Sequence, residues 1–298
     1  MSSRNRADVR DFLVTRRARI TPQQAGLTFY GGNRRVPGLR REEVAMLAGV
    51  SADYYTRLEK GNLSGVSDTV LDAIASALQL DEAERLHLTD LARAANTSPA
   101  RAARRNVPQQ VRPGIRLILD GMADTPAFIR NGRLDVLAVN ALGRALYSPL
   151  FASPGGTPNL ARFRFFDPAA RQFYPDFADS AHTTVELLRT EAGRDPFNPS
   201  LTGLIGELST RSEEFRALWA AHNVRLHRTG VKNFNHPAVG RLDLMFEAMA
   251  LEADEGLTLT AYTAEPGTPS HDGLQLLASW AVTHHKEDME DMEDIKSS

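Results

Sequence analysis

Along the first 95 positions, apolar residues recur at spacings of three and four, which is the period of a helix with one buried face. The first such segment covers about Arg4 to Arg19. Later segments begin after Ser67 and Asp81, two residue types suited to an N-cap. The pattern predicts five helices in one small all-α domain, residues 1–96. The positions expected to face its core include Val9, Phe12, Leu13, Val70, Leu71, Ile74, Leu78, Leu86, Leu88 and Leu91.

Two of the short helices meet at Ala-Gly-Val-Ser, residues 48–51. Gly49 can adopt the positive φ that ends a helix, and Ser51 is a good N-cap for the next one. Ala45 and Val50 supply the small contact and the apolar wedge that two steeply crossing helices need. This spacing resembles the helix-turn-helix of the Cro/repressor-type (XRE) regulators, whose second helix enters the DNA major groove. Tyr55 departs from that pattern, which prefers Val or Ile there.

The resemblance implies that Ser51 to Lys60 is a recognition helix. Its outward positions are then expected to face bases or phosphates, and the start of the preceding helix is expected to lie near the DNA backbone. The candidates are Ser51, Ala52, Asp53, Thr56 and Arg57 on the second helix, with Arg40 and Arg41 before the first. The alternative is an ordinary helical hairpin whose polar face is only solvated.

Two polar segments flank these helices. Residues 30–38 form a Gly-rich loop that carries Arg34 and Arg35, and either a basic arm on DNA or a plain connector fits it. Residues 97–112 lose the apolar period and become rich in Pro, Ser and Arg, which predicts a linker.

Beyond the linker the period changes. Apolar runs at 127–130 and 134–139 flank Asn131-Gly132, a strong hairpin signal. Asn140 is suited to cap a helix, and 159–177 is expected to contain helical turns and loops. Helices are expected over 179–191, 199–222 and 270–282, with strands within 224–236, 240–253 and 256–266. The segment 113–283 is therefore predicted to be an α+β domain with an antiparallel sheet of about five strands and helices on one side.

Charge is distributed unevenly over the chain. The formal net charge is -2, yet residues 1–112 hold 18 Lys and Arg against 12 Asp and Glu, while the remainder holds 17 against 25. The basic half contains the helix-turn-helix pattern. Clusters such as Arg16, Arg17 and Arg19 therefore fit an electrostatic footprint for phosphates, although charge runs usually mark a solvated face.

Composition excludes several classes of protein. With no Cys there is no disulfide, no thiolate zinc site and no Cys nucleophile. No stretch approaches the roughly 20 apolar residues of a membrane span, and the first residues lack the apolar core of a secretion signal, so a cytoplasmic protein is expected. We find no nucleophile elbow, no phosphate-binding Gly loop and no His pair at metal spacing. His271-Asp272-Gly273 is better explained as a helix start than as an acid-base site.

The last residues, 284–298, are acidic and repetitive, and we expect a disordered tail there. His284 and His285 stand beside its carboxylates. Adjacent histidines on a polar tail are weak evidence for a metal ion, so no metal site is expected.

The second half resembles a known family. The segments ARFRFFDPAARQFYPDF, GELSTRSEEFRALWAAH, VGRLDLMFEAMAL and YTAEPGTPSHDGLQLLASW look like the ligand-binding domain of the MmyB-like transcription regulators. GLRREEVAMLAGVSADYYTRLEKG is similar to the helix-turn-helix that those regulators carry. The resemblance implies a PAS-like sensor fold, and a fatty-acid-like ligand is associated with the family. It does not cover the acidic tail.

A pocket for an amphiphile needs an apolar interior and polar groups that orient the head. Candidates for the interior are Phe128, Leu137, Phe163, Phe165, Phe166, Phe173, Trp219, Leu244, Phe246 and Tyr262. Candidates for the head are Arg162, Arg171, Tyr174, His222 and Arg225, since a guanidinium binds a carboxylate through two parallel hydrogen bonds. The alternative is plain core with surface ion pairs.

These observations favour a sequence-specific DNA-binding regulator with a small-molecule effector, acting as a homodimer on double-stranded DNA, with no cofactor and no catalytic residues. Two other functions stay open. One is an enzyme targeted to DNA, and the other is an interaction adaptor that uses Trp219 and the Phe-rich segment as an apolar patch.

Overall fold

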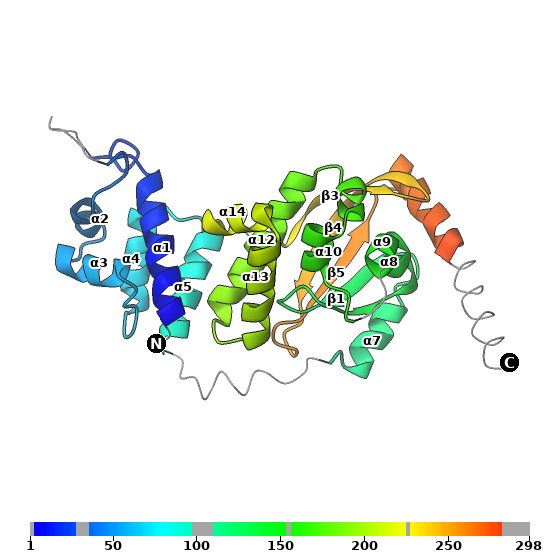
Figure 1. Cartoon of the computed structure of the whole chain (residues 1–298), viewed down its shortest axis with the longest axis horizontal. Helices are drawn as coiled ribbons and strands as arrows, with labels where there is room; N and C mark the ends of the chain where they lie inside the picture. The colour runs from blue at the N-terminus through cyan, green and yellow to red at the C-terminus, as the bar shows by residue number, and fades with distance from the viewer. Residues whose placement is uncertain (1–2, 28–35, 97–109, 153–155, 225–226, 282–298) are drawn as a thin grey trace. The chain divides into compact units, whose positions relative to one another are not determined.

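The computed structural model describes residues 3–27, 36–96, 110–152, 156–224 and 227–281, and the chain divides into two compact units (Figure 1). The first unit comprises residues 1–107 together with 185–226. The second comprises residues 108–184 together with 227–298. Residues 185–226 therefore belong by their packing to the unit that begins with the N-terminal helices.

Five helices precede residue 97, as the apolar period predicts. They are α1 (Ser3–Arg19), α2 (Arg41–Leu47), α3 (Ala52–Glu59), α4 (Asp68–Ala77) and α5 (Glu82–Asn96). Figure 1 draws them from blue to cyan, with α1 beside α5. Their apolar faces share one core, which includes Val9, Phe12, Leu13, Leu71, Ile74 and Leu78. At the start of α4 the Ser67 side chain accepts a hydrogen bond from the Val70 backbone, so the cap expected from the sequence is present.

One predicted core position in α5 is wrong. Leu86 is 43% exposed, whereas the neighbouring His87 is only 4% exposed. The His87 ring packs edge-on against Phe12, with 5.1 Å between ring centroids. Leu88 and Leu91 are buried as expected, so the difference is confined to one position. The contact of the His87 ring with Phe12 and the close packing around it favour His87 over Leu86 in the core.

Three further helical segments complete the first unit. Helix α12 (Phe177–Arg194) contributes its residues from 185 onward, and α13 (Pro199–Arg211) and α14 (Glu213–Ala220) follow. The expected single helix over 199–222 is thus two helices. Ser212 leaves the helical conformation with φ of -125° and ψ of 115°, and its side chain accepts a hydrogen bond from the Phe215 backbone. A Ser that caps a new helix ends the previous one.

Buried polar contacts join these later helices to α1 and α5. Arg16 is 2% exposed, its Nε lies 2.6 Å from a carboxylate oxygen of Glu84, and its Nη2 donates to the carbonyl of His222 at 2.6 Å. Arg189 donates to the His222 ring at 3.0 Å and to the carbonyl of Trp219. Since an isolated buried charge is costly, these contacts fix one arrangement of the helices.

At Gly193 the backbone of α12 lies close to the His87 side chain of α5. A Cβ placed on it would lie 2.6 Å from Cε1 and 2.7 Å from Nδ1 of His87. Gly193→Ala is therefore expected to destabilise the first unit by about 1–3 kcal/mol, the usual cost of overpacking. Thermal unfolding of Gly193→Ala, His87→Ala and the double variant measures it. Gly193→Ala should lower the melting temperature much less when residue 87 is already alanine. An equal decrease with and without His87 would contradict this packing.

The second unit is built on a five-stranded antiparallel sheet in the order β2-β1-β5-β4-β3, as Figure 1 shows for most of its strands. The strands are β1 (Ala127–Arg130), β2 (Val136–Val139), β3 (Thr229–His236), β4 (Gly240–Ala250) and β5 (Thr258–Thr263). The helices are α7 (Pro113–Asp120), α8 (Ala141–Leu146), α9 (Ser148–Phe151), α10 (Leu160–Phe166), α11 (Ala169–Phe173) and a closing helix over 269–281. Together they confirm the α+β prediction.

The two faces of the sheet are covered differently. One face packs against the segment from α8 to α11 and the closing helix, in a core that contains Phe128, Phe173, Phe234, Leu244 and Tyr262. The other face packs against α7 through Leu119, which meets Ile129 and Leu259. The expectation of helices on one side only is therefore wrong. Near β1 and β5, apolar side chains point to both faces of the sheet, so both faces must be shielded from water.

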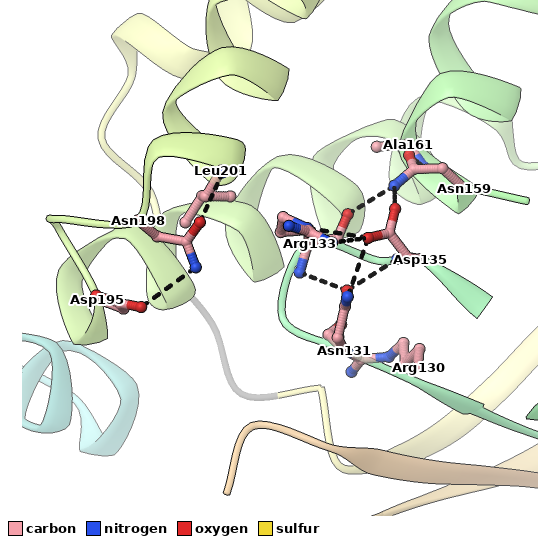
Figure 2. A network of polar contacts seen from close by, with 9 residues as sticks. All are labelled: Arg130, Asn131, Arg133, Asp135, Asn159, Ala161, Asp195, Asn198 and Leu201. Atoms are coloured by element: carbon pink, nitrogen blue, oxygen red, sulfur yellow. Dashed lines mark hydrogen bonds and ion pairs between the residues drawn. The ribbon is translucent and has the colours of Figure 1, made fainter. Parts of the chain in front are cut away.

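A polar network secures the turn after β1 (Figure 2). Asn131 donates to the Asp135 carboxylate at 2.9 Å and accepts from the Asp135 backbone at 3.0 Å. The same carboxylate accepts from Asn159 at 2.7 Å and pairs with Arg133 at 2.6 Å. Asn159 in turn caps α10 by accepting from the backbone of Ala161. The Asn-Gly hairpin thus positions the helix that carries Phe163 and Arg164.

Candidate DNA interface and ligand site

The turn between α2 and α3 has the geometry that the sequence predicts. Gly49 has a φ of +65°, and the Val50 backbone closes the turn by donating to the carbonyl of Ala45 at 3.0 Å. The Ser51 hydroxyl accepts from the Tyr54 backbone at 3.1 Å and caps α3. Tyr55 is fully buried. An aromatic side chain therefore fills the inward position at which the pattern prefers Val or Ile.

The outer face of α3 is open to solvent. Ser51, Ala52, Asp53 and Arg57 are exposed and Thr56 is half-buried, while Tyr55, Leu58 and Glu59 face inward. The Arg57 guanidinium lies over the Tyr54 ring, 4.9 Å from its centroid. The candidate base-reading positions therefore share one accessible surface on one short helix.

Glu59 anchors the inner face of α3. Its side chain is 1% exposed and accepts hydrogen bonds from Arg17 of α1 at 2.6 Å and from Arg41 of α2 at 2.7 Å. Burial alone raises the pKa of a carboxyl group, but the two guanidinium groups outweigh it, and the pKa of Glu59 lies below its ordinary value. One carboxylate thus ties α1, α2 and α3 together, and neither the sequence pattern nor the resemblance indicated it.

The sequence predicts that Arg16, Arg17 and Arg19 of α1 contact DNA phosphates, and the structure instead places acidic side chains beside them. Arg16 is buried against Glu84, and the Arg17 side chain is 14% exposed and engaged by Glu59. Arg19 pairs with Glu84 at 3.4 Å and donates to Asn223. The charges of Arg16 and Arg17 therefore serve internal ion pairs, because Glu84 and Glu59, distant in the sequence, fold beside them, whereas the Arg19 side chain stays 49% exposed.

The remaining basic candidates are placed in part. Arg40 is exposed, and Arg41 is half exposed although it donates to Glu59. Arg34 and Arg35 lie outside the described residues, as do most of the predicted linker and the acidic tail. Arg40 is consequently the clearest candidate for a contact with a DNA phosphate.

Two histidines in the first unit are held neutral. Burial, then the nearby guanidinium groups of Arg189 and Arg16, lowers the pKa of His87 to about 3. Burial and Arg189 lower the pKa of His222 to about 4, although Asp11 acts in the opposite direction. Both rings must charge when the unit unfolds in mild acid.

The free energy of unfolding is therefore expected to decrease as the pH is lowered. A His whose folded pKa is depressed contributes stability that is present above the unfolded value, about 6.5, and that is lost as pH falls toward the folded value. The melting temperature of the chain should decrease from pH 6.5 toward pH 4, and His87→Gln should flatten that decrease. His182→Gln, which changes an exposed histidine, is the control. Equal slopes in both variants would contradict the assignment.

In the second unit, aromatic rings converge beneath the sheet. The hydroxyl groups of Tyr147 and Tyr262 lie 2.6 Å apart, and burial raises the pKa of both phenols. Phe128, Phe173 and Phe234 stand within 6 Å of the Tyr147 ring centre. The cluster forms an apolar interior that holds a buried polar pair.

Cationic side chains border this cluster. Arg164 is 3% exposed, lies 3.3 Å from the Tyr174 ring centre and donates to Ser180. Lys232 stands 5.2 Å from the same ring centre. Sequence reasoning missed both residues. Lys232 occupies the same strand face as Phe234, so the alternation of β3 was the available signal.

The residues expected at the ligand site fall into three groups. Tyr174 is buried in the aromatic cluster, Phe166 is half-buried, and Arg162 and Arg171 are exposed, the latter over the Phe177 ring. Trp219 and His222 belong to the first unit, where Arg189 contacts both. Arg225 lies outside the described residues.

The other interior candidates divide between the two faces of the sheet. Phe128, Phe163, Phe173, Leu244 and Tyr262 lie in the aromatic core, and Phe246 packs against it. Leu137 instead packs beside α7 on the opposite face. Phe165 is half-buried in α10.

Across the described ranges, no three His, Asp or Glu side chains gather as a metal ion would require. None of the helices that the structure describes has the length and apolar character needed to cross a bilayer.

The fold and the exposed helix define a helix-turn-helix protein joined to an α+β domain. Family comparisons agree: residues 4–88 match a helix-turn-helix domain, and residues 111–277 match the MmyB-like transcription regulator ligand binding domain. The chain belongs to the MmyB-like transcription regulators. No curated protein matches it significantly.

The family boundaries and the packing differ in one respect. Residues 185–226 lie inside the matched ligand-binding segment, yet they pack with the helix-turn-helix unit. Part of the sensor segment is therefore structurally part of the DNA-binding unit.

Proposed function

We propose that this chain is a cytoplasmic transcription regulator that reads double-stranded DNA with α3 and responds to a small apolar or fatty-acid-like effector through a PAS-like domain. The observation that carries the proposal is the outer face of α3, where Ser51, Ala52, Asp53 and Arg57 are exposed on a helix held by the Gly49 turn. A recognition helix needs this combination of a fixed angle and an accessible surface.

The sensor half is supported by chemistry. Its core is a cluster of packed aromatic side chains around Tyr147 and Tyr262, an apolar environment that suits an alkyl chain, and cations border it at Arg164 and Lys232. An apolar interior with a few polar groups at one end is typical of sites for amphiphiles. No catalytic role is proposed for these residues.

We infer that the chain acts as a homodimer, because helix-turn-helix domains commonly read DNA as pairs. One chain presents one α3, and helix-turn-helix dimers place two recognition helices about 34 Å apart on successive major grooves. An effector that favours one dimer geometry then changes the affinity for DNA.

The test is whether binding of DNA and binding of a fatty acid affect each other, with decanoate, a ten-carbon fatty acid, as the probe. Duplexes enriched from a random library by the full chain are titrated with and without decanoate, and fluorescence anisotropy gives the dissociation constant. We expect decanoate to change DNA affinity by roughly 5- to 150-fold in either direction, with an equal reciprocal effect of DNA on decanoate binding. Failure to enrich any sequence would contradict DNA recognition, whereas enrichment without a decanoate effect would contradict the ligand class.

A further inference from the structure

Lys232 occupies an unusual position for a lysine. It lies on β3 with its side chain on the same face as Phe234, which is fully buried, and it is itself only half-buried. Its Nζ lies near two aromatic rings, 5.2 Å from the Tyr174 centre and 5.9 Å from the Phe234 centre. Lysine normally keeps its ammonium group in water.

The charges around Lys232 disfavour its protonated form. Burial, followed by the positive charges of Arg164 and Arg130, lowers the pKa of Lys232 to about 7, while Asp179 acts in the opposite direction. A cation beside other cations in a partly apolar site shifts toward the neutral amine. The neutral amine is therefore accessible nearer to neutral pH than it is for an ordinary lysine.

Arg164 shares the ring that Lys232 contacts. Its guanidinium lies 3.3 Å from the centre of Tyr174 and 5.2 Å from that of Phe177. Arginine stays charged under all ordinary conditions. Two basic groups thus meet at one aromatic side chain, at the border of the apolar cluster.

We propose that the sensor binds the carboxylate head of its effector between Arg164 and Lys232, and that Lys232 gains a proton as the carboxylate arrives. The inference rests on the proposed sensor function and specifies its ligand as an anion. The guanidinium supplies a permanent charge, and the arriving carboxylate stabilises the ammonium form of its neighbour.

The other groups near Lys232 do not compete for this proton. Tyr174 and the Tyr147–Tyr262 pair present hydroxyl groups, and burial raises the pKa of Tyr147 and Tyr262 further above neutrality. Arg164 and Arg130 keep their charges, and Asp179 is an exposed carboxylate. Carboxylate binding should therefore weaken as pH rises above 7, by at most about tenfold per pH unit for one linked proton.

Calorimetry of the full chain at pH 8 tests this. Decanoate is titrated in two buffers with different enthalpies of ionisation, and the difference in heat gives the protons taken up. We expect uptake approaching about one proton per decanoate, since Lys232 is mostly neutral at that pH. Decanol, which has the same chain and no charge, should bind at least about tenfold more weakly and without proton uptake.

Two lysine-to-arginine variants test whether Lys232 is the group that takes up the proton. Lys232→Arg keeps a cation that cannot lose its proton, so decanoate binding should persist while proton uptake disappears. Lys60→Arg, at the exposed end of α3, is the matched control and should retain the uptake. Uptake that survives in Lys232→Arg would overturn the assignment.

The outcomes also distinguish the two proposals. Equal affinity for decanol and decanoate would preserve an apolar effector and overturn the anionic anchor. Binding of neither compound would contradict the fatty-acid-like ligand class itself, and with it the anchor.

Discussion

Glu59→Ala is expected to lower the free energy of unfolding by about 3–5 kcal/mol, the usual cost of removing one partner from a buried ion pair. The variant leaves the Arg17 guanidinium, 14% exposed, without the carboxylate that accepts two of its N–H groups at 2.6 and 3.1 Å. It also releases Arg41 of α2. Because Glu59 holds α3 to both α1 and α2, its loss should loosen the position of α3, so DNA binding should weaken as well.

Urea unfolding measures this effect, and a surface ion pair provides the control. Arg93 pairs with Asp90 at 2.8 Å, but the Arg93 side chain is 70% exposed, so Arg93→Ala should cost no more than about 1 kcal/mol. Because the pKa of Glu59 is depressed in the fold, its contribution is present above the unfolded value of about 4.3 and is lost as pH falls below it. Equal losses for Glu59→Ala and Arg93→Ala would contradict the anchoring role.

Ala52→Glu is expected to reduce DNA affinity by at least about 100-fold, or ~3 kcal/mol, without destabilising the protein. Ala52 is exposed in the first turn of α3. A carboxylate there is favourable for the helix, because it complements the positive end of the helix dipole. The same carboxylate faces the negatively charged duplex if α3 enters the major groove, since recognition helices contact bases through their N-terminal residues.

Thr69→Glu is the matched control for this substitution. Thr69 is exposed in the first turn of α4, so the change adds the same charge to the same kind of helix position in the same unit. Anisotropy titrations should show DNA affinity within about threefold of the unchanged chain, since a distant surface charge is screened. If both variants lose affinity alike, the effect is one of net charge, and α3 has no special role.

Features set by neighbouring residues could be predicted from the sequence. Gly49, Ser51 and Asn140 act on backbone groups within three or four positions, so the turn and both caps were visible in the pattern. The Asn131-Gly132 hairpin and all five strands followed from local alternation. Of these features, the Gly49 turn and the Ser51 cap place the outer face of α3.

Features that depend on residues far apart in the chain could not be predicted from the sequence. Arg16 and Arg17 read as a basic patch, but Glu84 and Glu59, far along the chain, fold against them. His87 displaces Leu86 from the core because Phe12 and Gly193 shape the space beside it. Trp219 and His222 were grouped with the sensor by their sequence position, whereas the packing of α12 to α14 puts them in the first unit. Pair contacts over such separations leave no local period.

Selection of preferred duplexes from a random library by the unchanged chain and by three variants tests the central claim most directly. Asp53→Ala and Thr56→Ala should change which bases are enriched within a half-site, because their side chains lie on the outer face of α3. Arg40→Ala should keep the same preferred bases while it lowers affinity for all sequences and reduces the log–log salt slope by about 1. Identical base preferences in all four proteins would contradict recognition of DNA by α3.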